Sequence, residues 1–198
     1  VRGDNQAVLR AKDSVRVKFC ENAQVSAGKN LLVEGSVMHC KLYVGNALAV
    51  KEKLIGGETT CRRLVHVGEQ LGGGLSTITS IVLGYDPALL QKIAELKTRL
   101  EGLHQEKARL AVHVARNTPS AVQRDTDIAA KINVFEKQLA AWSEKLTSEK
   151  FDSCAVVAPG DVRPGVEVSI GPFFHANSDF LQDIRFSCKN NQIAANSP

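Results

Sequence analysis

Two stretches of this chain repeat apolar residues at alternating separations of four and three, and this pattern restricts the fold more than any other feature. The first covers residues 89–114 with one polar interruption at Lys107, and the second covers residues 128–146. The first seam consists of Leu89, Ile93, Leu96, Leu100, Leu103, Lys107, Leu110 and Val114, and the second of Ile128, Ile132, Phe135, Leu139, Trp142 and Leu146. Each seam forms a narrow apolar stripe on a helix, as in a coiled coil.

The joint between the two seams predicts how the helices are arranged. Residues 116–120 contain a proline and break the helical pattern. Two helices of similar length with a short connection fold back on each other, so we expect an antiparallel two-helix coiled-coil hairpin over residues 87–148. The alternative is two helices of a larger bundle, which would need a wider apolar face than these seams have.

The flanking segments, residues 1–86 and 149–198, read as short strands punctuated by glycine and asparagine. Val15, Val17 and Phe19 alternate with polar residues, which is typical of a strand with one buried face. A Pro-Gly pair at 164–165 precedes a second alternating run. The sequence therefore predicts a mainly β protein with an inserted helical segment.

A loose internal repeat predicts how these strands are organised. Leu42-Tyr43-Val44-Gly45-Asn46 is similar to Val65-His66-Val67-Gly68-Glu69 and to Ile81-Val82-Leu83-Gly84-Tyr85. Irregular repeats of about 20 residues with glycine at the corners are typical of a parallel β-helix, whose rungs are stable only when stacked. We therefore expect residues 1–86 to form the first part of one solenoid and residues 149–198 its closing part.

The five cysteines support a structural role. Cys20, Cys40 and Cys61 lie 20 and 21 residues apart, which would place them at equivalent positions of successive rungs as small buried side chains. Neither Cys154 nor Cys188 completes a close Cys pair, so no metal site is expected. No cofactor motif is expected either, because residues 72–77 lack the lysine of a phosphate-binding loop and read as a corner or bulge.

Charge and hydropathy limit the partners. The formal net charge is +4 and no dense basic stripe is present, so nucleic-acid binding is not expected. No run approaches the ~18 apolar residues of a membrane span, so direct membrane insertion is not expected. The partners should be other proteins, including further copies of the chain. Because the sequence begins at Val1 and its one methionine is Met38, we expect it to be part of a longer protein.

The order of these features resembles the C-terminal part of the flagellar assembly protein A family. The matching segments are residues 15–25, Val37-Met38-His39-Cys40 leading to Val44, Ile55-Gly56-Gly57-Glu58, Thr77 with residues 81–84, and residues 163–171. The resemblance implies a right-handed parallel β-helix with a protruding helical hairpin. It also implies a cytoplasmic, bacterial role in flagellar assembly or polar organisation, with no catalytic residues to carry over.

Two groups of residues are candidates for partner binding. Arg109, Arg116 and Arg124 form a basic tip of the hairpin, which is either a contact for an acidic partner or an ordinary solvated helix surface. Phe173 and Phe174 form an apolar cluster, which is either a docking patch if exposed or a cap over the last rung if buried.

The function expected from these features is that of a non-enzymatic scaffold, with the solenoid as platform and the hairpin as lever. One alternative is a β-helix acyltransferase-like enzyme that uses His39 or His66 as a general base, although no acidic partner stands at a defined spacing from either histidine. A second alternative is a cytoskeletal solenoid that polymerises end to end.

Overall fold

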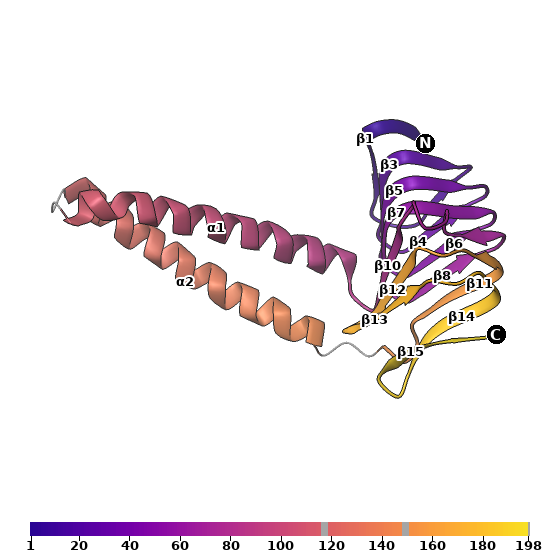
Figure 1. The fold of residues 1–198 in the computed structure, drawn as a ribbon. Helices are drawn as coiled ribbons and strands as arrows, with labels where there is room; N and C mark the ends of the chain where they lie inside the picture. The colour runs from indigo at the N-terminus through magenta and orange to yellow at the C-terminus, as the bar shows by residue number, and fades with distance from the viewer. Residues whose placement is uncertain (116–118, 148–150, 198) are drawn as a thin grey trace. The chain divides into compact units, whose positions relative to one another are not determined.

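The strand-rich segments coil into stacked rungs whose strands pair in parallel with those of the neighbouring rungs (Figure 1). The computed structural model describes residues 1–115, 119–147 and 151–197. These residues divide into two units, one made of Val1–Pro87 with Glu149–Pro198 and the other of Ala88–Ser148. The first unit is the solenoid and the second is helical.

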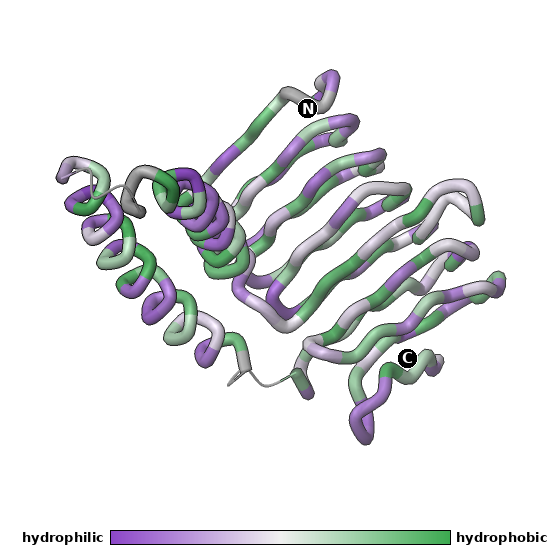
Figure 2. The backbone as a smooth tube through the Cα atoms, turned by 60° about the vertical axis from the view of Figure 1, so that its left-hand side comes forward, coloured by the Kyte–Doolittle hydropathy of each residue, from purple (hydrophilic) through white to green (hydrophobic). Residues whose placement is uncertain are grey.

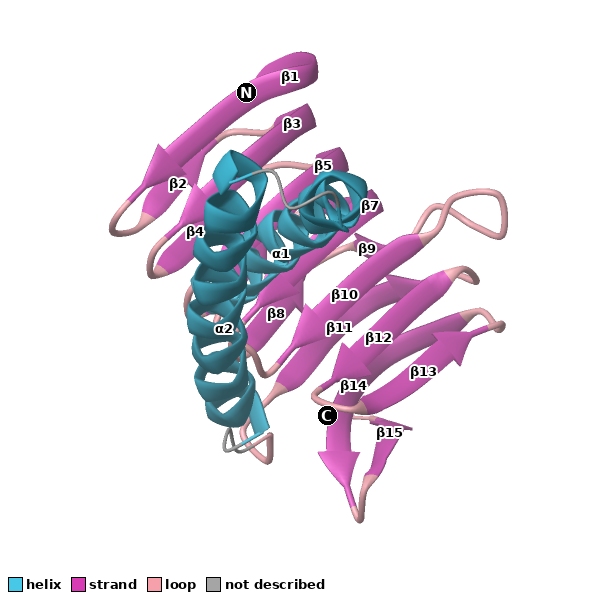
Figure 3. Ribbon diagram, turned by 90° about the vertical axis from the view of Figure 1, so that its left-hand side faces the viewer, coloured by secondary structure: helices cyan, strands magenta, loops and turns pink. Residues whose placement is uncertain are grey.

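Each rung contributes one strand to each of two parallel series. The longer series is β1 (Arg2–Ala11), β3 (Cys20–Ala27), β5 (Val37–Val44), β7 (Lys53–Cys61), β10 (Thr79–Leu83) and β12 (Val166–Ile170). The shorter series is β2 (Val15–Val17), β4 (Asn30–Val33), β6 (Ala47–Val50), β8 (Leu64–Val67) and β11 (Ala155–Val162), and β9 (Gln70–Leu71) bridges β7 and β11. Figure 3 labels strands of both series, which lie side by side along the stack.

The true repeat is 17 residues long in the middle of the stack, which corrects the predicted repeat. Val25 pairs with Leu42 and Leu42 with Thr59, so successive rungs are offset by 17 positions. Ile81 also pairs with Thr59 and therefore shares a column with Leu42. Val65 instead pairs with Leu48 in the other series, so the predicted equivalence of residues 42–46 and 65–69 is wrong. Both segments are alternating strands that end in glycine, and that local likeness concealed their different places on the rung.

The core is formed by alternate side chains of the strands, which are buried inside the solenoid. Figure 2 shows hydrophobic and hydrophilic residues following one another along the strands. In β5, Leu42 and Val44 are fully buried, and Leu31, Leu48 and Val65 stack at equivalent positions of the other series. Such columns of aliphatic side chains bury each rung against the next, which a single rung could not do alone.

The strands that follow the helical segment continue the stack begun before it. β12 pairs in parallel with β10, and the two ends of β11 pair in parallel with β8 and β9. The final strands are antiparallel: β13 (Phe173–Asn177) pairs with β12, β14 (Leu181–Lys189) pairs with β11, and β15 (Gln192–Asn196) pairs with β14. Parallel stacking therefore ends at this side of the described solenoid.

The inserted segment forms two helices, α1 (Pro87–Ala115) and α2 (Pro119–Thr147). A proline opens each helix, where its missing N–H costs no intrahelical hydrogen bond. The two helices pack through the predicted seam, in which Leu100, Ile128 and Ile132 form a buried cluster flanked by Phe135 and Leu139. Among the described residues, neither helix combines the length and apolar character needed to cross a membrane.

Candidate functional site

The predicted basic tip is only partly described. Arg109 is exposed on α1 and Arg124 is exposed on α2. Arg124 donates from Nε to Glu106 Oε1 at 2.8 Å, so a carboxylate of the other helix already balances its charge. Arg116 lies outside the described residues. Partner binding at this tip therefore stays a prediction.

The two phenylalanines are separated by the alternation of β13. Phe174 is 63% exposed, whereas Phe173 is half-buried, because neighbouring residues of a strand face opposite ways. The ring of His175 lies 5.6 Å from that of Phe186, which is fully buried. Phe186 thus fills the last part of the core, and Phe174 is the apolar side chain that faces solvent.

The two histidines of the enzyme hypothesis stand in different strand series. His39 sits at a corner within β5 in the left-handed region, with φ of 51°, beside the backbone of Gly56 in the next rung. His66 lies on β8 between Ala49 and Val157 of the adjacent strands. His39 lines a pocket with Gly57 and Glu58, and His66 is not among the residues that line it.

The predicted burial of the three cysteines is confirmed, but their predicted equivalence is wrong. Cys20, Cys40 and Cys61 are all buried. Cys20 pairs with Val37, whereas Cys40 pairs with Gly57, so the thiols belong to different columns. Burial raises the pKa of Cys40 and Cys61 above the ordinary value, and raises that of Cys20 to about 11. These thiols are neutral at physiological pH, which suits packing and opposes nucleophilic attack.

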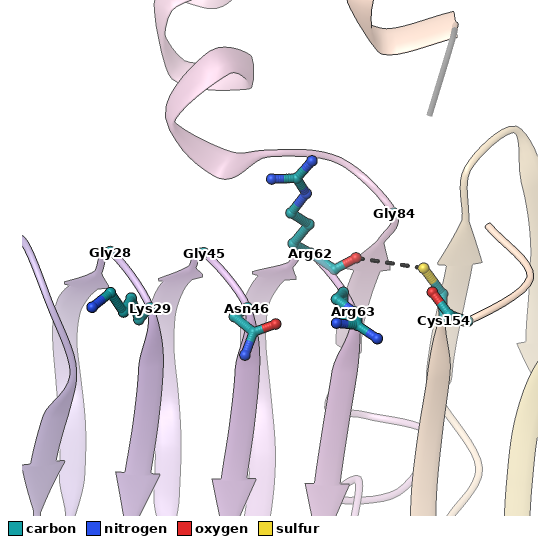
Figure 4. Close-up of a pocket in the computed structure, with 9 residues that line it drawn as sticks. Gly28, Lys29, Gly45, Asn46, Arg62, Arg63, Gly84 and Cys154 are labelled. Atoms are coloured by element: carbon teal, nitrogen blue, oxygen red, sulfur yellow. Dashed lines mark hydrogen bonds between the residues drawn. The ribbon is translucent and has the colours of Figure 1, made fainter. Parts of the chain in front are cut away.

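A groove that the sequence reasoning did not find runs along one corner of the solenoid, where β3, β5 and β7 turn into the shorter series. This corner groove has a volume of about 440 Å³. Its lining residues are Gly28, Lys29, Gly45, Asn46, Arg62, Arg63, Gly84, Ser153 and Cys154. Figure 4 shows Lys29, Asn46 and Arg63 in a row on successive corners, with Arg62 extending to the other side.

Two glycines of the lining stand where the backbones of neighbouring rungs touch. A Cβ on Gly28 would lie 2.0 Å from the carbonyl oxygen of Lys12, and one on Gly45 would lie 2.0 Å from that of Gly28. On these two rungs the corner therefore demands glycine, because the backbones of neighbouring rungs meet there. The next rung carries Arg62 at the corresponding point, so the third rung adds a long side chain to the lining of the groove.

The backbone of the corner is already hydrogen-bonded. The N–H groups of Lys29, Asn46 and Arg63 donate to carbonyl oxygens of the preceding rungs at 3.2, 2.7 and 3.0 Å. The thiol of Cys154 donates to the Arg62 carbonyl oxygen at 3.4 Å, which ties the start of β11 to this corner. Side chains rather than backbone amides are thus the groups that the corner groove offers to a ligand.

The electrostatics of the corner groove are positive. Lys29, Arg62 and Arg63 are exposed, and the lining contains no acidic side chain. Asp13 on the preceding corner pairs with Lys29 Nζ at 3.0 Å, and this hydrogen bond holds the pKa of Asp13 below its ordinary value. Lys29, Asn46 and Arg63 are 17 residues apart, and this spacing is the sequence signal that could have revealed the row. The expected repeat of about 20 residues does not bring these three positions together.

Comparison with known proteins agrees with the fold. The family model described as the flagellar assembly protein A beta solenoid domain matches residues 1–193. No curated protein and no solved structure matches the chain. The match covers nearly the whole chain, including the strands before and after the helices, and agrees with the parallel stack described above. The chain therefore belongs to the flagellar assembly protein A (FapA) family.

Proposed function

We propose that this chain is a non-enzymatic scaffold in flagellar assembly, which holds other proteins or further copies of itself together in the bacterial cytoplasm. The observation that carries the proposal is the family match over residues 1–193. The stacked rungs support it physically, because a core of fully buried aliphatic columns makes a rigid platform.

The proposal includes the finer architecture. We propose that the solenoid winds to the right, as nearly all parallel β connections do. We also propose that α1 and α2 form an antiparallel coiled coil. Two pairs support this: Glu106 near the end of α1 meets Arg124 near the start of α2, and His104 lies 3.9 Å from Glu136. Such a hairpin presents two long helical surfaces to a partner.

A scaffold is favoured over the acyltransferase-like enzyme by the chemistry of the available groups. His39 and His66 stand in different strand series, and three of the thiols are buried with raised pKa values. In the part of the chain that the structure describes, no three His, Cys, Asp or Glu side chains are grouped so as to hold a metal ion. The proposal includes no cofactor, no nucleic acid and no membrane insertion.

The end-to-end polymer is a weaker alternative. Continuous stacking needs an open parallel edge at both ends of the solenoid, whereas β13, β14 and β15 add antiparallel strands at one end. Light scattering against concentration separates the two models: a polymer grows steadily without a plateau, and a scaffold of fixed stoichiometry reaches one.

Complementation tests the proposed function. Cells of the source organism that lack the gene should lose flagella and motility, and the wild-type gene should restore both. We expect Leu100→Asp to fail, because it disrupts the helical unit, and Thr98→Asp on the exposed face to succeed. Full flagellation of cells without the gene would refute the flagellar role, and full rescue by Leu100→Asp would refute the role of the hairpin.

The same assay separates the scaffold from the enzyme. We expect His39→Ala and His66→Ala to restore flagella and motility. If one of these variants folds and binds its partner but does not restore motility, the enzyme is favoured.

A further inference from the structure

We propose that the corner groove binds an acidic, extended segment of a partner protein. This inference rests on the proposed scaffold function and assigns it a recognition site on the solenoid itself. In the bound state, carboxylates of the partner would contact Lys29 and Arg63, and Arg62 would flank the segment from the other side of the corner.

Charge is the first argument. The lining of the corner groove holds three cationic side chains and no acidic one. Arg63 is exposed and makes no ion pair with any residue that the structure describes. Lys29 forms an ion pair with Asp13, but both side chains are about two-thirds exposed. A solvent-exposed ion pair contributes little free energy, so Lys29 can exchange Asp13 for another carboxylate at little cost. An incoming carboxylate therefore meets one uncommitted cation and one that is easily shared.

The linear arrangement selects an elongated ligand. Lys29, Asn46 and Arg63 succeed one another along the backbone ladder of the corner. Neighbouring strands are about 4.8 Å apart, so the backbones of Lys29 and Arg63 are separated by roughly 10 Å. An extended peptide, which rises about 3.3 Å per residue, covers that separation with three residues. The two cations are thus spaced for side chains about three residues apart in an extended peptide rather than gathered around one centre.

Two other anions fit less well. A phosphate site is usually built from backbone N–H groups that converge on the ligand, but the N–H groups of this corner donate to the preceding rung. A single-stranded nucleic acid is usually held by aromatic side chains on which its bases stack, and the groove lining contains none. An acidic peptide needs neither feature, because its carboxylates and backbone can use side chains.

The shape of the corner groove agrees with a peptide. Gly28 and Gly45 line the corner groove with backbone atoms alone, so at these two turns only Lys29 and Asn46 project a side chain into the lining. Asn46 lies midway and donates through Nδ2 to Asn30 Oδ1 at 2.8 Å, which orients its carbonyl oxygen as an acceptor. That oxygen can accept a hydrogen bond from the backbone N–H of the bound segment.

Binding of a defined probe tests the proposal. The probe is a fluorescein-labelled 12-residue peptide of alternating Glu and Gly, and fluorescence polarisation is measured with the intact chain at low salt. Arg63→Gln should weaken binding roughly two- to fivefold, the range for one exposed charge pair. Asn46→Lys, which adds a cation to the row, should tighten binding by a similar factor. Arg185→Gln, which removes an exposed arginine from β14 outside the groove, should leave binding unchanged.

The outcomes are exclusive. Equal binding by Arg63→Gln and Arg185→Gln, or no gain with Asn46→Lys, would overturn the site. Tighter binding of a 12-nucleotide single strand than of the peptide would assign the groove to nucleic acid, and displacement of the peptide by equimolar inorganic phosphate would assign it to a compact anion. If the peptide does not bind but complementation still requires Leu100, the scaffold function is retained and only the binding site is rejected. If the protein binds the peptide but is dispensable for flagella, the proposed function is rejected and the binding site in the corner groove is retained.

Discussion

At the scale of single residues, the corners of the solenoid depend on backbone contact between rungs. Asn22, His39 and Gly56 occur at 17-residue spacing and all have positive φ, so one corner turns through a left-handed residue on three successive rungs. Asparagine and glycine adopt this conformation readily, whereas His39 adopts it at some cost in strain. The second corner instead uses Gly28 and Gly45 because there is no room for a Cβ.

Gly45→Ala should therefore destabilise the solenoid. The new methyl group would lie 2.0 Å from the carbonyl oxygen of Gly28, and backbone cannot move aside as a flexible side chain can. We expect a loss of about 1–3 kcal/mol in the free energy of unfolding, measured by urea titration of the strand signal in circular dichroism. Gly102→Ala is the matched control, because a Cβ there meets nothing within 4 Å and alanine favours the helix. Equal stability of Gly45→Ala and wild type would contradict the corner contact.

The buried thiol of Cys20 predicts a dependence of stability on alkaline pH. Its pKa is about 11 in the folded chain because of burial and the nearby Cys40, against an ordinary value of 9.0. Between these values the unfolded chain releases a proton that the folded chain retains, so the free energy of unfolding falls as pH rises. We expect a fall on the order of 1–2 kcal/mol between pH 9 and 11. Cys20→Ala, which keeps the other titrating groups, should show a smaller fall; identical slopes would refute the assignment.

At the scale of elements, the helical unit is held by a narrow seam. Ile93, Leu96 and Leu100 of α1 are each less than 8% exposed, whereas Trp142 and Leu146 at the far end of α2 are half-buried. A two-helix unit covers its seam on one side only, so its stability rests on few fully buried side chains. The strands differ, because most of them pair on both edges and bury one whole face.

Leu100→Asp tests this dependence. The aspartate would place an unpaired charge among Ile128 and Ile132 at a cost of several kcal/mol, which exceeds what this small cluster supplies. We expect a large loss of the 222 nm helix signal with the strand signal retained, since the solenoid is a separate unit. Thr98→Asp adds the same charge on the exposed face and should keep its helix. A helix signal in Leu100→Asp equal to that of the control would show that the seam is assigned wrongly.

At the scale of the whole molecule, the helices interrupt the solenoid without interrupting its core. The chain leaves the stack after β10 and re-enters it before β11. The rings of Tyr85 and Phe151, on either side of the insertion, have centroids 5.6 Å apart, and Phe151 also covers Gly84. The residues that flank the inserted segment thus meet within the solenoid unit. A rung can accept a long insertion at such a corner because the strands before and after it keep their places in the ladder.

Replacement of residues 88–148 by a short Gly-Ser linker should therefore leave the solenoid folded. β12 would still pair with β10, and β11 with β8, because these contacts do not involve the helices. We expect the midpoint of thermal unfolding of the strand signal to change by only a few degrees, about what 1 kcal/mol produces in a domain of this size. A chain that aggregates or shows no cooperative unfolding would mean that the helices are needed to form the stack.

Local patterns in the sequence determined which segments are helical and which are strands. The apolar spacing of four and three predicted the seam through Leu100 and Ile128, and the alternation at Val166, Val168 and Ile170 predicted β12, whose inward side chains are fully buried. Period and side-chain direction are properties of a short segment, so a short segment suffices to read them.

Only the tertiary structure decided which strands are neighbours, and with it the position of the corner groove. Val65 resembles Leu42 in its local setting but stacks on Leu48, because the turn between the two series changes the face to which a segment belongs. Lys29 and Arg63 lie 34 positions apart in the sequence, with nothing local to link them. They share one groove because each rung repeats the course of the one before it, and that register is set by the stacking of whole rungs.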